Sequence, residues 1–442
     1  MRPLRVLYDV SVLGYGQQDE RCRTGVYRVI ENIAKKLDSA DDIELTFCAA
    51  QTWKALEGAI QYLETHRELF PNVPLVRNVQ YTEIYQGLTG VHRVLEALDP
   101  DPDRNPDSAD FFENLQSAVA KTLRVYGKVA HPLGTRNLKE YDVFHSTFYP
   151  IPAHLPRGNG TVTFATVYDL IPLILPEMFA GDGNNHTEFQ RMVDTLQALT
   201  PDDHVLCISQ SARNDLLSFA PLDPDRVRVT PLAANPDVFY PCSDPQTRAV
   251  VRARYAIPDE PYILGVSTFE PRKNLDHLVR CFARLVREEG LSDLRLVLVG
   301  ARGWNYAPIF DELHKAGLSD ERVILTGYVA DNDLAPLYSG ALAFVYPSLY
   351  EGFGLPPLEA MQCGTPVITS NNSSLPEVVG EAGILVDAMD ADGLCQAMLD
   401  LYRKPTRRVE LARLAQQRAK LFSWERCADE TISAYRSALA SG

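Results

Sequence analysis

Two glutamates in the second half of the chain carry the clearest chemical signal. Glu351 and Glu359 are separated by seven residues, and Gly352 and Gly354 follow the first of them. Glycines let a ligand approach the backbone closely, and free amides at a helix start attract a phosphate or a polar sugar. The second carboxylate suits the two hydroxyls of a ribose. A glycine-rich turn whose glutamate complements the helix dipole fits the same spacing, so both interpretations stay open at this point.

The elements that must position these glutamates are those of a parallel α/β protein. Short, β-branched apolar runs alternate with longer helical patterns, and many of the runs are apolar on both faces. About six strands in each half predict two doubly wound, Rossmann-like domains. The expected strands are Arg5–Leu13, Ile43–Ala50, Tyr141–Phe148, Thr161–Val167, His204–Ser209, Arg226–Pro231, Tyr262–Ser267, Leu294–Gly300, Arg322–Gly327, Ala341–Pro347, Pro366–Ser370 and Gly383–Val386.

Proline- and aspartate-rich stretches mark the expected breaks between these elements. The stretch Pro236–Pro261 predicts a domain boundary, which we place after residue 240. A second irregular patch, Asp99–Asp110, is expected to be a solvated loop inside the first domain. The last segment, Phe422–Leu439, has helical spacing with Ser423 as its cap.

Composition excludes several classes of protein. The 442 residues include 43 Lys and Arg against 58 Asp and Glu, and the net charge of −15 argues against a nucleic-acid binder. No apolar run approaches the ~18 residues of a membrane-spanning helix. The eight cysteines and nine histidines form no CxxC, HxH or HxxxH pattern, so we expect neither a zinc site nor a disulfide framework. The Asp-x-Asp triples are expected to be caps or solvated loops, and they are Asp101/Asp103, Asp223/Asp225 and Asp331/Asp333.

The segment Tyr346–Pro366, YPSLYEGFGLPPLEAMQCGTP, resembles the E-x7-E signature of the family-four retaining glycosyltransferases. Further blocks follow in the family's order. They are Gly265–Leu275 (GVSTFEPRKNL), similar to the phosphate-binding lysine loop, Val323–Val329 (VILTGYV), similar to the loop around the nucleotide base, then LPEV at 375–378 and the terminal FSWE.

This resemblance covers most of the chain and implies the GT-B fold, in which two Rossmann-like domains face a cleft. Residues 1–240 would bind the acceptor and residues 241–421 the nucleotide sugar. Residues 422–442 would form a helix that packs back on the first domain.

The resemblance also implies a role for each residue near the nucleotide sugar. Arg272 and Lys273 would stabilise the charge of the departing nucleoside diphosphate, although a solvated pair at a helix start is the alternative. Glu359 would hold the ribose, Val329 would lie near the base, and Glu351 would face the sugar. Many relatives carry another arginine a few positions before Arg272, in a region that reads Val266–Ser267–Thr268 here, so that contact is absent or replaced by hydroxyls. The expected catalytic residues are Glu351, Lys273 and Arg272, and the expected donor-binding residues are Glu359, Gly352, Phe353, Gly354, Leu355, Val329, Thr24, Gly25 and Ser267.

Three residues of the first half are expected on the sugar or acceptor side. Many relatives have His–Asp where this chain has Tyr168 and Asp169, and a tyrosine does not titrate near neutrality. His145 ends a neighbouring expected strand, where it either faces the cleft or is a satisfied structural histidine. Thr24 and Gly25 resemble the loop that approaches the donor phosphate, with a plain βα connection as the alternative.

The function expected from the resemblance is a retaining glycosyltransferase that moves a hexosyl group to a glycan or lipid-linked saccharide. The EPRKNL segment resembles that of mannosyltransferases of bacterial surface polysaccharide assembly, which suggests mannose from GDP-mannose, and UDP- or dTDP-sugars stay open. No cofactor or metal is expected, because helix amides and cations neutralise the diphosphate. The expected location is cytoplasmic, and peripheral contact with the inner face of the membrane is compatible with it. The alternatives are a twin-Rossmann epimerase, a phosphorylase, and a sugar-binding protein without catalysis.

Overall fold

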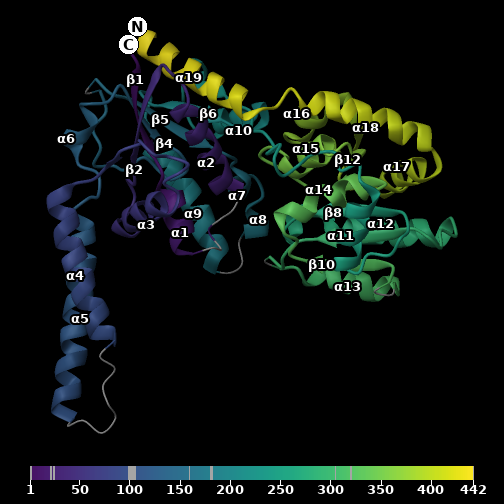
Figure 1. Cartoon of the computed structure of the whole chain (residues 1–442), viewed down its shortest axis with the longest axis horizontal. Coiled ribbons are helices and arrows are strands. Elements are labelled where there is room, and N and C mark those ends of the chain that lie inside the picture. The colour runs from purple at the N-terminus through teal and green to yellow at the C-terminus, as the bar shows by residue number, and fades with distance from the viewer. Residues whose placement is uncertain are drawn as a thin grey trace.

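Two parallel β-sheets organise the chain (Figure 1). The computed structural model describes residues 2–19, 22, 25–97, 106–158, 160–179, 183–303, 305–318 and 321–441. Every strand pairing within these residues is parallel, and helices pack against each sheet. The predicted α/β class with two Rossmann-like sheets is therefore confirmed. Across the same residues, no helix is both long enough and apolar enough to cross a membrane.

The first sheet has seven strands in the order β3-β2-β1-β4-β5-β6-β7. Leu7 in β1 and Phe144 in β4 are at most 1% exposed, as expected for strands covered on both faces. The two-residue strand β3 was not predicted, because it is too short to show a hydrophobic pattern. The strands are β1 (Leu4–Asp9), β2 (Ile43–Cys48), β3 (Leu75–Val76), β4 (Val143–Ser146), β5 (Val162–Val167), β6 (His204–Cys207) and β7 (Val227–Val229).

The second sheet has six strands in the order β10-β9-β8-β11-β12-β13. The order reverses between β8 and β11, and ligands of doubly wound sheets bind at such a switch point. All six strands were predicted, with small shifts at their ends. They are β8 (Tyr262–Val266), β9 (Arg295–Val299), β10 (Val323–Gly327), β11 (Ala343–Tyr346), β12 (Val367–Ser370) and β13 (Ile384–Val386).

Helices connect the strands of each sheet. In the first half they are α1 (Ser11–Gln18), α2 (Gly25–Asp38), α3 (Trp53–Thr65), α4 (Val79–Ala97), α5 (Pro106–Val129), α6 (Thr135–Leu138), α7 (Ile171–Ile174), α8 (Pro176–Phe179), α9 (Gly183–Ala198), α10 (Gln210–Phe219) and the 3₁₀ turn η2 (Pro224–Arg226). In the second half they are α11 (Pro245–Arg254), η3 (Pro271–Lys273), α12 (Leu275–Glu288), α13 (Ala307–Ala316), α14 (Asp331–Gly340), α15 (Leu355–Gln362), α16 (Leu375–Val379), η4 (Gly380–Ala382), α17 (Ala391–Arg403), α18 (Pro405–Ala419) and α19 (Trp424–Ser441).

Helix α11 supports the domain boundary that we propose after residue 240. We call the first sheet with its helices the first unit, and the second sheet with its helices the second unit. Helix α11 packs against α14 of the second unit, and Arg254 of α11 forms an ion pair with Asp333 of α14 at 2.6 Å. The chain therefore joins the second unit before it enters the strand β8. We also propose that residues 422–442 form a separate segment that returns to the first unit, because α19 packs against α2 and β5.

Helix α1 begins at Ser11, inside the expected strand Arg5–Leu13. The strand β1 stops at Asp9, whose carboxylate accepts hydrogen bonds from the Ser11 amide and hydroxyl. A β-carbon at Gly14 would lie 2.1 Å from the Ala55 carbonyl oxygen, so α1 and α3 pack at a distance that only glycine permits. This close helix contact is tertiary, and the local pattern does not reveal it.

Helices α4 and α5 form a hairpin that extends away from the first sheet (Figure 1). Helix α5 already begins at Pro106, where the sequence predicted a loop up to Asp110, and residues 98–105 lie outside the described residues. Trp53 of α3 holds the base of the hairpin. Its ring stacks on that of Tyr85 with 5.2 Å between the ring centroids, and its Nε1–H donates to the Ala130 carbonyl oxygen at 2.9 Å.

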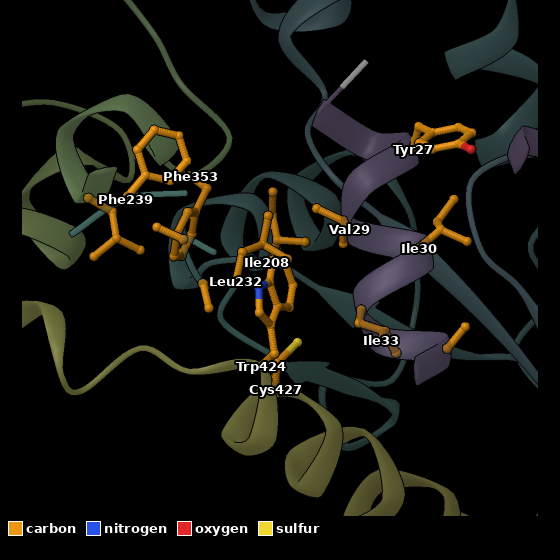
Figure 2. Packing of buried hydrophobic residues seen from close by; sticks show 14 of the residues in the cluster. Tyr27, Val29, Ile30, Ile33, Ile208, Leu232, Phe239, Phe353, Trp424 and Cys427 are labelled. Atoms are coloured by element: carbon orange, nitrogen blue, oxygen red, sulfur yellow. The ribbon is translucent and has the colours of Figure 1, made fainter. Parts of the chain in front are cut away.

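The C-terminal helix α19 crosses back to the first sheet, as the resemblance implied (Figure 1). It packs against α2 and β5. Figure 2 shows Trp424 and Cys427 at its start beside Leu232 and Ile208, with Phe353 of the second unit close by. Further along, the Tyr435 hydroxyl and the His145 Nδ1 atom are 2.6 Å apart. The helix thus buries apolar side chains from both units in one cluster.

We predict that Tyr435→Phe destabilises the first unit without changing the affinity for substrate. Tyr435 and His145 are both at most 1% exposed, so removing the hydroxyl leaves a buried imidazole nitrogen without its partner. The expected loss is about 1–3 kcal/mol of unfolding free energy, measured by denaturant titration. Tyr402→Phe, whose hydroxyl meets Asp293 at the surface, is the matched control and should change little. Equal stability of both variants would contradict the prediction.

Candidate active site

A cavity of about 400 Å³ lies at the carboxyl ends of strands from both sheets. Tyr168 and Asp169 follow β5 of the first sheet, whereas Arg272, Lys273 and Glu351 follow β8 and β11 of the second. The cavity therefore opens at the switch point of the second sheet, where a ligand is expected. A larger cavity of about 860 Å³ is lined by Phe239, Phe422 and Trp424, but neither Glu351 nor Glu359 lines it.

A buried ion cluster forms one wall of the 400 Å³ cavity. The Glu351 Oε1 atom accepts hydrogen bonds from Lys273 Nζ at 2.6 Å, Tyr346 Oη at 2.8 Å and Ser348 Oγ at 2.7 Å. Its Oε2 atom lies 2.7 Å from an Arg272 guanidinium nitrogen. The three charged side chains are only 10–15% exposed, so these interactions are weakly screened by solvent.

The cluster keeps Glu351 and Arg272 charged. Burial alone would raise the pKa of Glu351, but Arg272 and Lys273 more than offset it and hold this pKa at about 2. Burial and the neighbouring Arg272 lower the pKa of Lys273, and Glu351 and Glu270 oppose this shift. Burial also disfavours the charged guanidinium, but the same two glutamates raise the pKa of Arg272 further above its ordinary value. A permanently ionised Glu351 is unsuited to proton transfer and suited to holding the cations.

Two loops hold the cluster in place. Asn274 adopts a left-handed conformation with φ of 56°. The Nδ2 atom of its side chain donates hydrogen bonds to the carbonyl oxygens of Pro347 and Ala388. The carbonyl oxygen of Arg272 accepts from the Leu349 amide at 2.8 Å. The loops after β8 and β11 are therefore bonded to each other, which fixes the cations against the carboxylate.

Gly352 brings the second sheet's loop against the first unit. A β-carbon there would lie 2.6 Å from the Tyr168 carbonyl oxygen and 2.8 Å from Asp169 Cβ, so only glycine fits. The Gly352 carbonyl oxygen accepts from Ser209 Oγ at 2.7 Å, and the Tyr350 hydroxyl donates to Asp215 at 2.8 Å. Gly352 also lines the cavity, where it is expected to let a ligand approach, and in the structure it permits contact between the two units.

Glu359 lies on the first turns of α15 and lines the cavity. Its Oε2 atom accepts from the Tyr338 hydroxyl at 3.1 Å, and it makes no ion pair within the described residues. Burial raises the pKa of Glu359 from 4.5 to about 7. Two more polar groups line the same space. Ser267 has a buried Oγ without a hydrogen-bond partner in the described part of the chain. Burial raises the pKa of Asp169, and the charge of Arg272 opposes this shift.

Most of the predicted site residues meet at this cavity. Gly25 at the start of α2 lines it from the first unit, opposite Leu355 of α15, and Tyr168 and Asp169 complete that side. The residues that line it from the second unit and were predicted are Ser267, Arg272, Lys273, Glu351, Gly352, Phe353, Gly354, Leu355 and Glu359.

Two of the described residues that were predicted do not line the cavity. His145 is buried in the first unit, where its two ring nitrogens meet Tyr435 and Thr166, and burial lowers the pKa of its imidazole to about 3. The structural interpretation of His145 therefore replaces the cleft-facing one. Val329 is 4% exposed and packs into the apolar cluster, and Thr24 lies outside the described residues.

Sequence reasoning missed three polar residues of the ion cluster. Tyr346 and Ser348 donate to Glu351, and Glu270 accepts from Arg272 at 2.6 Å. Each lies within five residues of a predicted site residue, so the only available signal was proximity in sequence. Which of the neighbouring polar side chains turn towards Glu351 depends on the loop conformation.

The described residues contain no group of three or more His, Cys, Asp or Glu side chains arranged to hold a metal ion. Asp223 caps η2, as predicted for the Asp-x-Asp triples. Asp331 and Asp333 instead form ion pairs with Arg28 and Arg254. Asp101 and Asp103 lie outside the described residues.

Comparison with known proteins places the chain in a family. Residues 260–404 match the family model described as "Glycosyl transferases group 1". The O-antigen chain mannosyltransferase B of Escherichia coli is 31% identical over 373 residues, which is 84% of this chain and 94% of that protein. The chain belongs to the group 1 glycosyltransferases. This glycosyltransferase is also 31% identical to the serotype-specific mannosyltransferase WbdA of Escherichia coli over 298 residues, 67% of this chain but only 36% of WbdA.

Solved structures show the same fold for this glycosyltransferase. Sucrose-phosphate synthase from Thermosynechococcus elongatus superimposes with a TM-score of 0.64 at 21% identity and covers both chains completely. WaaG, a glycosyltransferase involved in lipopolysaccharide biosynthesis, gives 0.59 at 14% identity over 97% of this chain and 98% of its own. The fold is thus GT-B, and the enzyme is a nucleotide-sugar-dependent glycosyltransferase.

We predict that Glu359→Gln stabilises the enzyme at high pH and not at low pH. Because the pKa of Glu359 is raised from 4.5 to about 7 in the folded state, ionising it opposes folding. The free energy of unfolding of the wild type should therefore fall as pH rises between these two values. Above pH 7 the glutamine variant should be more stable by roughly 2 kcal/mol, a value reduced for partial exposure.

The measurement is denaturant unfolding of both proteins at pH 5 and pH 8. Glu381→Gln, at an exposed glutamate of the same unit, is the control and should show no such dependence. A difference between wild type and Glu359→Gln that is the same at both pH values would contradict the shifted pKa.

Proposed function

We propose that this glycosyltransferase transfers a mannosyl group from GDP-mannose, with retention of configuration, to a saccharide or lipid-linked saccharide acceptor. The observation that carries the proposal is the cavity in which Arg272, Lys273 and Glu359 converge at the switch point of the second sheet. The choice of mannose rests on the two mannosyltransferases of Escherichia coli to which the chain is 31% identical. The first is named for the O-antigen chain, which supports a glycan acceptor, and the second is named as serotype-specific.

The ion cluster supplies the chemistry of the leaving group. As the bond from the sugar C1 to the phosphate oxygen breaks, negative charge grows on the nucleoside diphosphate, and Arg272 and Lys273 stabilise it. The acceptor hydroxyl forms the new bond to C1 on the same face, and its proton passes to the leaving phosphate oxygen. Glu351 is ionised and engaged by both cations, so we assign it the positioning of these cations and no proton transfer.

The remaining residues bind and enclose the donor. Glu359 makes no ion pair within the described residues and is free to accept hydrogen bonds from the ribose hydroxyls. The Ser267 hydroxyl, which has no partner within the described residues, is available to the diphosphate. Tyr168 and Asp169 close the cavity from the first unit, which we assign to the acceptor. The contacts of Gly352 with this unit exclude water that would otherwise hydrolyse the donor.

The first test is binding and turnover with a panel of GDP-, UDP-, dTDP- and ADP-sugars. GDP-mannose at ~100 times its dissociation constant should stabilise the enzyme by ~2.7 kcal/mol in a thermal-shift assay. Stabilisation by UDP-sugars alone would overturn the choice of donor.

A substitution tests the diphosphate site. Lys273→Ala should lower kcat by about 10²-fold, because a charge-assisted contact in a water-excluded site is lost. Lys315→Ala, at an exposed lysine of α13, is the control. Wild-type turnover of Lys273→Ala would overturn the diphosphate site.

The second test concerns metal ions. We propose that Arg272 and Lys273 take the place of a divalent cation at the diphosphate, so turnover should survive an excess of EDTA. The measurement is the initial rate with EDTA, and then with added Mg²⁺ or Mn²⁺. A rate that EDTA abolishes and either metal restores would show that the donor is bound with a metal.

A further inference from the structure

The hairpin of α4 and α5 presents an apolar face that nothing in the described part of the chain covers. Val91 and Val94 of α4 are 50% and 60% exposed, and Ile84 is 45% exposed. On α5, Leu115 and Val125 are 38% and 55% exposed. Such side chains are common as single residues on a surface, but here they concentrate on one projecting element (Figure 1).

The spacing of these residues is that of a coiled-coil seam. On α4 the exposed residues Ile84, Gly87, Val91 and Val94 are three, four and three residues apart. On α5 the exposed residues Leu115, Ala118, Thr122 and Val125 repeat the same spacing. A 3-4-3 repeat of apolar or small residues lines one side of a helix and packs against another helix.

Both seams are distinct from the contacts that hold the hairpin together. Those contacts use other positions, because Tyr85 of α4 stacks on Trp53 and Tyr126 of α5 meets Trp53 and Tyr81. Each helix therefore has an inner face that builds the hairpin and an outer seam that has no partner in the described residues. Two such seams side by side fit a second pair of helices.

The charge sequence of α5 favours a second copy of the same helix in the opposite direction. Its first half contains three acidic residues and its second half three basic residues, and these are Asp107, Asp110, Glu113, Lys121, Arg124 and Lys128. This order suits the helix dipole, and it also makes two antiparallel copies of α5 complementary in charge. A lipid surface fits less well, because anionic headgroups would meet the acidic half.

We propose that the α4–α5 hairpin is the docking surface for a second copy of this chain. The two α5 helices pack antiparallel and the two α4 helices lie alongside them, which gives a four-helix bundle. With the two-fold axis between residues 116 and 117, Leu115 lies level with Ala118 of the second copy. In the same register, Asn114 flanks Lys121 of the second copy.

The first experiment measures the molar mass of the full chain by light scattering over a wide range of protein concentration. The wild type should be a dimer, and Val125→Glu should weaken dimerisation by more than about a hundredfold, because it buries two charges at the seam. Val409→Glu, at an exposed valine of α18, is the control and should remain a dimer. A monomeric wild type overturns the proposal, and a monomer that binds vesicles of anionic lipid points to a membrane surface instead.

The second experiment tests the register with two substitutions at one exposed position. Asn114→Glu should tighten the dimer about threefold, because each copy gains an ion pair with Lys121 of the other, and Asn114→Lys should weaken it. The effects of the two substitutions on the stability of a single helix are the reverse of their effects on the dimer. A lysine at position 114 follows Asp110 by four residues and therefore stabilises the helix. Circular dichroism of both variants separates the two effects. A dimer strengthened by lysine and weakened by glutamate, or unchanged by both, would overturn the antiparallel register.

Discussion

The ion pairs of Glu351 with Arg272 and Lys273 are the interaction on which the candidate site depends. Removing two cations from water costs several kcal/mol each, and a carboxylate in direct contact offsets this only when the geometry is good. Glu351 meets that demand with contacts of 2.6 Å and 2.7 Å and with two further hydroxyl donors. The cations can therefore lie at the base of a cleft, where a diphosphate is bound with little competition from water.

The same cluster links the chemistry to the assembly of the two units. Its carboxylate belongs to the loop whose next residue, Gly352, contacts Tyr168 and Ser209 of the first unit. A displacement of the first unit therefore acts on the loop that holds the cations. The apolar cluster of Figure 2 lies on the same boundary, where Phe353 and Trp424 pack together with Leu232. Ionic and apolar contacts between the two units thus both stabilise the shape of the cleft.

The hairpin of α4 and α5 stands apart from this network. It is attached at its base by Trp53, and none of the residues described in α4 and α5 lines the cavity. A substitution on its outer seam can change association of the chain without touching the donor site. The GT-B architecture thus leaves room for a separate interaction element within the first unit.

The sequence by itself determined every strand of the described residues except β3, the assignment of these strands to two parallel sheets, and the pair of loops that carry the chemistry. Strand patterns are local, since a run buried on both faces is apolar whichever neighbour it meets. The grouping of Arg272, Lys273, Glu351 and Glu359 at one site followed from the resemblance to known motifs. It agrees with the fold, because parallel strands bring the loops that follow them to one edge of the sheet.

Tertiary structure alone decided what those residues touch. His145 ends a strand as predicted, yet α19 covers it, and that helix comes from the far end of the chain. Gly352 serves a contact between units, and α1 forms where Gly14 meets α3. The ionised state of Glu351 and the raised pKa of Glu359 separate two glutamates that look alike in the sequence. Burial and partner charge set these differences, and both depend on residues that are distant in the chain and adjacent only after folding.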